Sequence, residues 1–253
     1  MPAIDPRTVG GFLKQCELKP HQVQEWMNRK EAPCFDERAG RVKEILREAT
    51  QESHDPHHIV LSFDEKTGMQ ALERCAPTKP MRVGCPERRE FEYIRHGTLV
   101  LFMNVPTGMI ETSLLPNRTN EDTARVFKAH LQAHLAAGAT RMTMMLDQLN
   151  THMSTDVVKV VATLCGLPMP AADDIDTMVK RRAWLEQDDK PIVFCFTPKH
   201  ASWLNPIETW FGVLARKILP RGSFRSIAEL ETKVVAFVTY FNEKLAHPYR
   251  FHL

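Results

Sequence analysis

Three carboxylates, those of Asp64, Asp147 and Glu208, stand where they could hold divalent metal ions. Asp64 and Asp147 each follow an apolar run of the kind that forms a buried strand, and Glu208 is the single acidic residue among the six Lys or Arg of residues 190–228. Cleavage of a phosphodiester by two Mg²⁺ ions, about 3.5 to 4 Å apart, needs such hard oxygen ligands. The acids are separated by 83 and 61 residues, so only folding can bring them together. They are the parts of a nuclease-type metal site.

Each of the three acids also has a purely structural interpretation. Asp64 could be a turn residue at a strand end, and Asp147 could stand in a turn or cap a helix. The stretch Asn205-Pro206-Ile207-Glu208 is a good helix start, with Asn at the N-cap, Pro at the first helical position and Glu at the third, as in a capping box. From the local sequence alone, both interpretations stay open.

Polar and basic residues near these acids are candidates for contacts with DNA phosphates, although such residues most often simply lie on a solvent-exposed surface. Asn150 and His152, just after Asp147, could either orient a carboxylate or touch a phosphate. Around Glu208 the basic candidates have no nearby acid to pair with except Glu208 itself. They are Lys199, His200, Arg216, Lys217, Arg221 and Arg225.

The composition is that of a globular protein: 253 residues, 43% hydrophobic and 25% charged. The net charge of +2 is small, so only local clusters of basic residues point to an anionic partner. Six cysteines without a Cys-x-x-Cys pair fit a reduced, cytosolic setting. There is no signal-peptide core and no apolar run near the roughly 18 residues of a membrane span. His130 and His134 lack the Glu of a zinc-protease motif, so we expect a surface or hydrogen-bonded pair.

The hydrophobic pattern predicts an α/β layered domain. A hairpin is expected between residues 59–63 and 69–72, across Thr67-Gly68. Acids at the ends of strands in such a domain converge at one edge of the sheet. Residues 166–191 have no clear period and are expected to form an inserted helix with loops over the sheet. The remaining predicted elements are strands at 97–105, 142–146 and 192–196 and helices at 119–137, 153–164 and from Asn205 onward.

The N-terminal region is predicted to be helical. Residues 6–32 have the spacing of two short helices, which fits part of a helical DNA-binding unit and a plain helical hairpin equally well. A charged amphipathic helix follows over residues 36–52. We therefore predict two regions, a partial helix-turn-helix-like DNA-binding region at 1–52 and a catalytic domain at 53–253.

Five stretches, in this order, resemble the IS630-family transposases, bacterial relatives of the Tc1/mariner group, and the resemblance covers about residues 58–250. The stretches are Phe63-Asp-Glu-Lys-Thr-Gly-Met-Gln-Ala-Leu-Glu-Arg74, Glu92-Tyr-Ile-Arg-His-Gly97, Leu146-Asp-Gln-Leu-Asn-Thr-His152, Phe196-Thr-Pro-Lys-His-Ala-Ser-Trp-Leu-Asn-Pro-Ile-Glu-Thr-Trp-Phe211 and Arg221-Gly-Ser-Phe-Arg-Ser226.

This resemblance implies a ribonuclease H-like fold, an α/β mixed sheet flanked by helices, with a DDE triad carried by Asp64, Asp147 and Glu208. It implies two Mg²⁺ or Mn²⁺ ions, cleavage at transposon ends and strand transfer into TA-containing target DNA. The expected partner is double-stranded DNA, bound by a homodimer in the bacterial cytoplasm, at the nucleoid. Arg95 and His96, in the second of the similar stretches, are further candidates for DNA contacts.

The chain departs from the family pattern in three ways. Gln148 stands where Asn is common, the spacing between the last two acids is lengthened by residues 166–191, and residues 7–32 resemble only the final portion of the usual helix-turn-helix region. We therefore expect an N-terminally truncated copy with a whole catalytic domain. The alternatives are a related endonuclease that cuts without joining and a non-transposing DNA-binding relic.

Overall fold

The computed structural model describes residues 5–16, 34–66, 71–88, 92–96, 98–105, 107–115, 119–217 and 226–248. The chain divides into two compact units, Met1–Pro33 and Cys34–Leu253. In the first unit the described element is α1 (Pro6–Gln15), whose N-cap Asp5 accepts a hydrogen bond from the Arg7 N–H. The second short helix predicted before residue 33 lies outside the described residues. The helix-turn-helix interpretation therefore stays a prediction.

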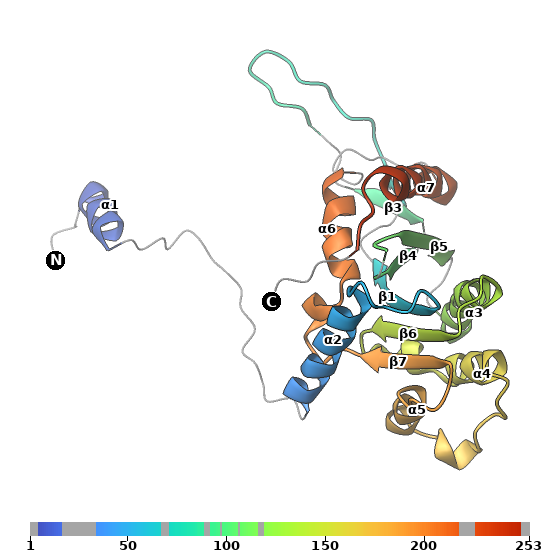
Figure 1. The fold of residues 1–253 in the computed structure, drawn as a ribbon. Coiled ribbons are helices and arrows are strands. Elements are labelled where there is room, and N and C mark those ends of the chain that lie inside the picture. Colours follow the sequence, from blue (N-terminus) through green and yellow to red (C-terminus); the bar gives the residue numbers. More distant parts are fainter. Residues whose placement is uncertain are drawn as a thin grey trace. The chain divides into compact units, whose positions relative to one another are not determined.

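The second unit is built on a mixed five-stranded sheet (Figure 1). The strands lie in the order β5 (Ile110–Leu115), β4 (Thr98–Asn104), β1 (His58–Lys66), β6 (Arg141–Leu146) and β7 (Ile192–Phe196). The pairs β5–β4 and β4–β1 are antiparallel, whereas β1–β6 and β6–β7 are parallel. The predicted α/β class, a mixed sheet flanked by helices, is confirmed.

One predicted strand pairing is wrong. The sequence suggested a hairpin between residues 59–63 and 69–72, but β1 pairs with β4, and the short strand β2 (Ala71–Arg74) pairs with β3 (Tyr93–His96) in a separate two-stranded sheet. The apolar run of β1 accounts for the difference, because a strand that is buried on both faces belongs in the middle of a sheet, between two long partners.

Alternate residues of the central strands pack against different helices. Val60, Met145 and Cys195 form a cluster with α2 (Phe35–Ala49), whereas Leu61 and Phe194 belong to a larger core. That core lies under α3 (Asn120–Ala136), α4 (Thr155–Leu164) and α5 (Met178–Leu185). This is the two-residue period of a strand with both faces covered. Figure 1 shows α2 on one side of the sheet and α3 and α4 on the other.

The amphipathic helix predicted at 36–52 is thus part of the sheet-containing unit. Ala39, Val42, Leu46 and Ala49 of α2 are buried against the sheet, so the compact unit begins at Cys34 rather than at the predicted residue 53. A helix with one apolar stripe is stable only where that stripe is covered, and the sheet face supplies the cover. Two further helices, α6 (Ile207–Lys217) and α7 (Ile227–Lys244), contact β1 and β5 respectively.

Strand β5 is an edge strand, and helical side chains cover it. The Asn242 side chain on α7 accepts a hydrogen bond from the Ile110 N–H and donates one to the Ile110 carbonyl, both at 2.8 Å. Glu111 joins β5 to α3, because its carboxylate lies 2.7 Å from His130 Nδ1 and 2.8 Å from His134 Nε2. The histidine pair is therefore hydrogen-bonded, one of the two predicted outcomes. Among the described residues no helix is long and apolar enough to span a membrane.

Candidate active site

Asp64 and Asp147 come from neighbouring parallel strands. β1 and β6 pair with Ser62 beside Met145, and continuing that register by two residues brings Asp64 alongside Asp147, the first residue after β6. Glu208 is the second residue of α6, and α6 contacts β1. Three segments far apart in the chain thus bring the three predicted acids to one end of the central strands.

The electrostatics of Asp64 reflect this convergence. Burial and the negative charge of Asp147 raise the pKa of Asp64 to about 7, and Glu208 contributes in the same direction. A hydrogen bond of 2.7 Å from the Glu65 N–H partly opposes the shift. Like charges that gather at a half-buried site are stabilised by a divalent cation, and carboxylate oxygens are the ligands that Mg²⁺ and Mn²⁺ prefer.

The donor set therefore fits such a cation by charge and by ligand type. The carboxylates do not already form a closed cage, since no three His, Cys, Asp or Glu side chains of the described residues are grouped as a ready metal site. Glu208 is partly exposed, so its carboxylate has room to adjust.

Asp147 is held in place by His152. The Nδ1 atom of His152 lies 2.8 Å from Asp147 Oδ1, and the same oxygen accepts a hydrogen bond from the Leu149 N–H at 3.0 Å. On its other side, His152 Nε2 lies 3.9 Å from Glu65 Oε1, a charge contact too long for a hydrogen bond. Burial lowers the pKa of His152, but the two carboxylates outweigh it and raise that pKa to about 9.

The prediction that His152 contacts DNA is wrong. Its side chain is fully buried, with its ring centroid 5.1 Å from that of Phe63 and 6.2 Å from that of Phe127. The cause is the short 3-10 turn η1 (Asn150–Met153), which folds the chain back so that His152 points into the core. The alternative role, orienting a carboxylate, agrees with the contact to Asp147.

The start of α6 differs from the predicted capping box. The side chain of Asn205 does not cap the helix: its Nδ2 donates to the Phe63 carbonyl at 2.8 Å, and its Oδ1 accepts from the Ser62 hydroxyl. The Ser62 hydroxyl in turn accepts a hydrogen bond from the Ile207 N–H at 2.9 Å. The cap of α6 therefore comes from β1, because Asn205 is buried against that strand.

Comparison with protein families agrees with this geometry. The family described as DDE superfamily endonuclease matches residues 59–231, a span that contains all three acids. The chain belongs to the DDE superfamily endonuclease family. A comparison with curated protein sequences gives no match.

Solved structures of Mos1 transposase share the fold of this DDE chain. The Mos1 mariner paired-end complex with Mn has a TM-score of 0.56 at 12% identity, covering 93% of this chain and 64% of that one. The Mos1 strand transfer complex has a TM-score of 0.54 at 12% identity, covering 92% and 62%. The chain thus spans less than two thirds of the length of these transposases. The similarity confirms the predicted ribonuclease H-like fold.

The predicted DNA contacts of the DDE domain fall into two groups. Lys199 and His200 follow β7, Arg216 and Lys217 end α6, and all four side chains are exposed, as is Asn150. Arg95 and His96 lie on β3, but their side chains are outside the described part, and so are Arg221 and Arg225. All of these DNA contacts stay predictions.

Four residues make contacts near the acids that were not predicted from the sequence. They are Ser62, Glu65, Asn205 and Arg182. Ser62 had one signal in the sequence, as the single polar residue of the apolar run at 59–63. Arg182 donates to the Gln148 side chain at 3.0 Å, and Gln148 Nε2 donates to the Thr197 carbonyl at 2.8 Å. The longer amide of Gln148 thus links the residue after Asp147 to α5 and to the first residue after β7.

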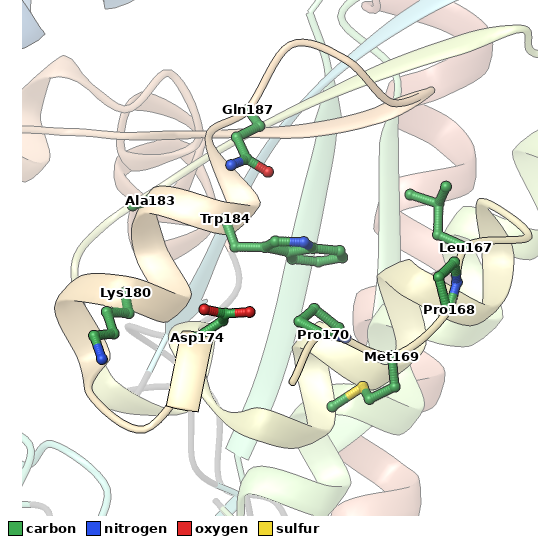
Figure 2. Close-up of a pocket in the computed structure, with 9 residues that line it drawn as sticks. All are labelled: Leu167, Pro168, Met169, Pro170, Asp174, Lys180, Ala183, Trp184 and Gln187. Carbon is green, nitrogen blue, oxygen red and sulfur yellow. The ribbon is translucent and has the colours of Figure 1, made fainter. Parts of the chain in front are cut away.

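The segment 166–191 contains the predicted helix, α5, and a pocket of about 610 Å³ (Figure 2). The pocket is separate from the acids, since none of the three lines it. Figure 2 shows Trp184 between Gln187 on one side and Asp174 and Pro170 on the other. The other lining residues are Leu167, Pro168, Met169, Lys180 and Ala183.

Proposed function

We propose that this chain is a DNA transposase of the IS630 type that uses Mg²⁺ or Mn²⁺, in two ions, to cleave DNA at transposon ends and to join those ends to TA-containing target DNA. The observation that carries the proposal is the convergence of Asp64, Asp147 and Glu208 at a largely buried site, where burial together with the charges of Asp147 and Glu208 raises the pKa of Asp64 to about 7. The fold shared with Mos1, a transposase solved as a paired-end complex with Mn, supports it.

The three acids would hold the ions. Bound divalent ions would supply the positive charge that stabilises the attacking and leaving oxygens of the phosphodiester. Asp64 and Asp147 approach from neighbouring strands and Glu208 from α6, so three directions of approach are available. His152 fixes one oxygen of Asp147 and so orients the carboxylate. Hydrogen bonds of this kind orient metal ligands and sharpen their geometry.

The DNA would lie over the exposed basic residues on either side of the acids. Lys199 and His200 follow β7, and Arg216 and Lys217 end the helix that carries Glu208. The positive charges of Lys199, Arg216 and Lys217 would neutralise phosphates and bring the scissile bond to the carboxylates. Arg95, His96, Asn150, Arg221 and Arg225 are proposed as further contacts. We also propose that the protein acts as a homodimer on DNA and that residues before Cys34 take part in recognising the transposon end.

The decisive experiment is cleavage of labelled transposon-end DNA in the presence of Mg²⁺. Asp147→Asn and Glu208→Gln remove one ligand charge each, and we expect both to lower the cleavage rate at least 100-fold. Asp156→Asn is a matched control, because Asp156 is an exposed acid in the first turn of α4. It should cleave like the wild type. Equal cleavage by wild type and Asp147→Asn would remove the proposed mechanism.

A DNA endonuclease that cuts without joining is the second candidate, since the matching family is described as an endonuclease. A pre-cleaved transposon end separates the two functions, because it bypasses the first cut. A transposase joins this end to a target duplex that contains TA, whereas an endonuclease leaves it unjoined. A wild-type protein that binds end DNA but neither cuts nor joins it would instead be a non-transposing relic.

A further inference from the structure

A small polar network connects the strand that carries Asp64 to the helix that carries Glu208. Ser62 precedes Asp64 by two residues on the same face of β1, and Asn205 precedes Glu208 by three. The Ser62 hydroxyl donates to Asn205 Oδ1 and accepts from the Ile207 N–H, while Asn205 Nδ2 donates to the Phe63 carbonyl. Three hydrogen bonds thus join the middle of β1 to the start of α6.

The network lies in the interior. Ser62 has 0% and Asn205 1% of its surface exposed, so water cannot replace these bonds. A buried polar group that loses its partner costs about 1 to 3 kcal/mol, whereas an apolar pair of similar shape would pack there without that risk. Stability alone is therefore a poor reason for a hydroxyl and an amide here. Fixed geometry is a better one, because each bond has a defined direction.

The position of the network indicates what geometry it fixes. Asp64 and Glu208 carry like charges, so in the metal-free protein they repel each other and favour a movement of α6 away from β1. The network ties α6 to β1 at the residues next to both acids. We infer that Ser62 and Asn205 are positioning residues that hold Glu208 opposite Asp64 and so preform the metal site. This inference rests on the proposed function.

Metal binding without DNA tests the inference. Ser62→Ala removes the hydroxyl and two of the three bonds, and we expect its affinity for Mn²⁺, measured by isothermal titration calorimetry, to fall about 10- to 100-fold. Leu214→Ala is the matched control. Leu214 is fully buried on the same helix, away from the network, so this change should lower the unfolding temperature but keep Mn²⁺ affinity within about threefold of the wild type.

Ser62→Cys provides a second variant for the measurement of Mn²⁺ affinity if Ser62→Ala is too unstable to titrate. It keeps the side-chain volume with a weaker donor and acceptor, and its Mn²⁺ affinity should also fall, by about tenfold. Wild-type Mn²⁺ affinity in the soluble Ser62 variant would overturn the inference. Failure of the proposed function looks different, since the wild type itself would then bind no Mn²⁺ or Glu208→Gln would leave its affinity unchanged.

Discussion

At the scale of single residues, His152 illustrates how a core position can orient a carboxylate of the proposed metal site. Its ring fills space between Phe63 and Phe127, as an apolar residue would, and its Nδ1 still contacts Asp147 Oδ1. These two roles can be separated, because phenylalanine could take over the packing but not the hydrogen bond.

We therefore expect His152→Phe to lose about 10- to 100-fold in cleavage rate. Its unfolding temperature should also fall, because the change removes the positive charge that the carboxylates of Asp147 and Glu65 stabilise in the interior. Affinity for end DNA, measured by fluorescence anisotropy, should stay unchanged, since the fully buried ring cannot touch a phosphate. A variant that loses DNA affinity but cleaves bound DNA normally would return His152 to the role first predicted for it.

At the scale of elements, Glu111 joins the edge strand β5 to α3. Burial raises the pKa of Glu111, but the hydrogen bonds from His130 and His134 together have the larger effect and lower the pKa to about 2. A carboxyl group whose pKa falls on folding stabilises the protein above the unfolded pKa of about 4.5, and this stabilisation is lost as the pH falls toward 2. The contact should therefore hold the edge strand at neutral pH and weaken in acid.

The expected result for Glu111→Gln is a loss of about 1 to 3 kcal/mol in the free energy of unfolding at pH 7. Urea titrations at pH 7, 5 and 3 check it, because the difference from wild type should shrink at pH 3. Glu243→Gln, an exposed change on α7, should cost little at any of these pH values. A difference that is constant with pH would mean that the ionised form of Glu111 has no special role.

The helices and strands also show which features could be predicted from the sequence, namely local ones, and which could not, namely long-range partners. The strand that carries Asp64 and the strand that precedes Asp147 were predictable, because an apolar run and the acid after it are local features. The partner of Ser62 was not, since Asn205 lies 143 residues away and its side chain was free to be a local helix cap. The erroneous hairpin has the same cause: a strand's choice of partner depends on the whole sheet, and β1 found longer neighbours elsewhere.

At the scale of the whole molecule, the compact unit that carries the acids begins at Cys34, and α2 belongs to it. A protein that lacks residues 1–33 should unfold within about 2 °C of the full chain. A protein that lacks residues 1–52 also loses α2 and exposes Val60, Val105, Met145 and Cys195, at a cost of about 5 kcal/mol or more.

Thermal unfolding followed by circular dichroism compares the two truncations directly. Equal unfolding temperatures for both would contradict the packing role of α2. End-DNA binding by the 34–253 protein is a separate measurement, and it would show how much recognition depends on the first unit.

The alternation of side chains along β1 has a consequence for a copy of the protein in which β1 is paired in the wrong register. Ser62 and Asp64 serve the face that meets α6, while Phe63 and Glu65 serve the face that meets His152 and the large core. If β1 slipped by one residue against its neighbours, every side chain would change face, so the carboxylates and the core would be lost together. A copy with β1 in the wrong register would therefore lack the proposed metal site, because only the correct pairing of β1 with β6 brings Asp64 alongside Asp147.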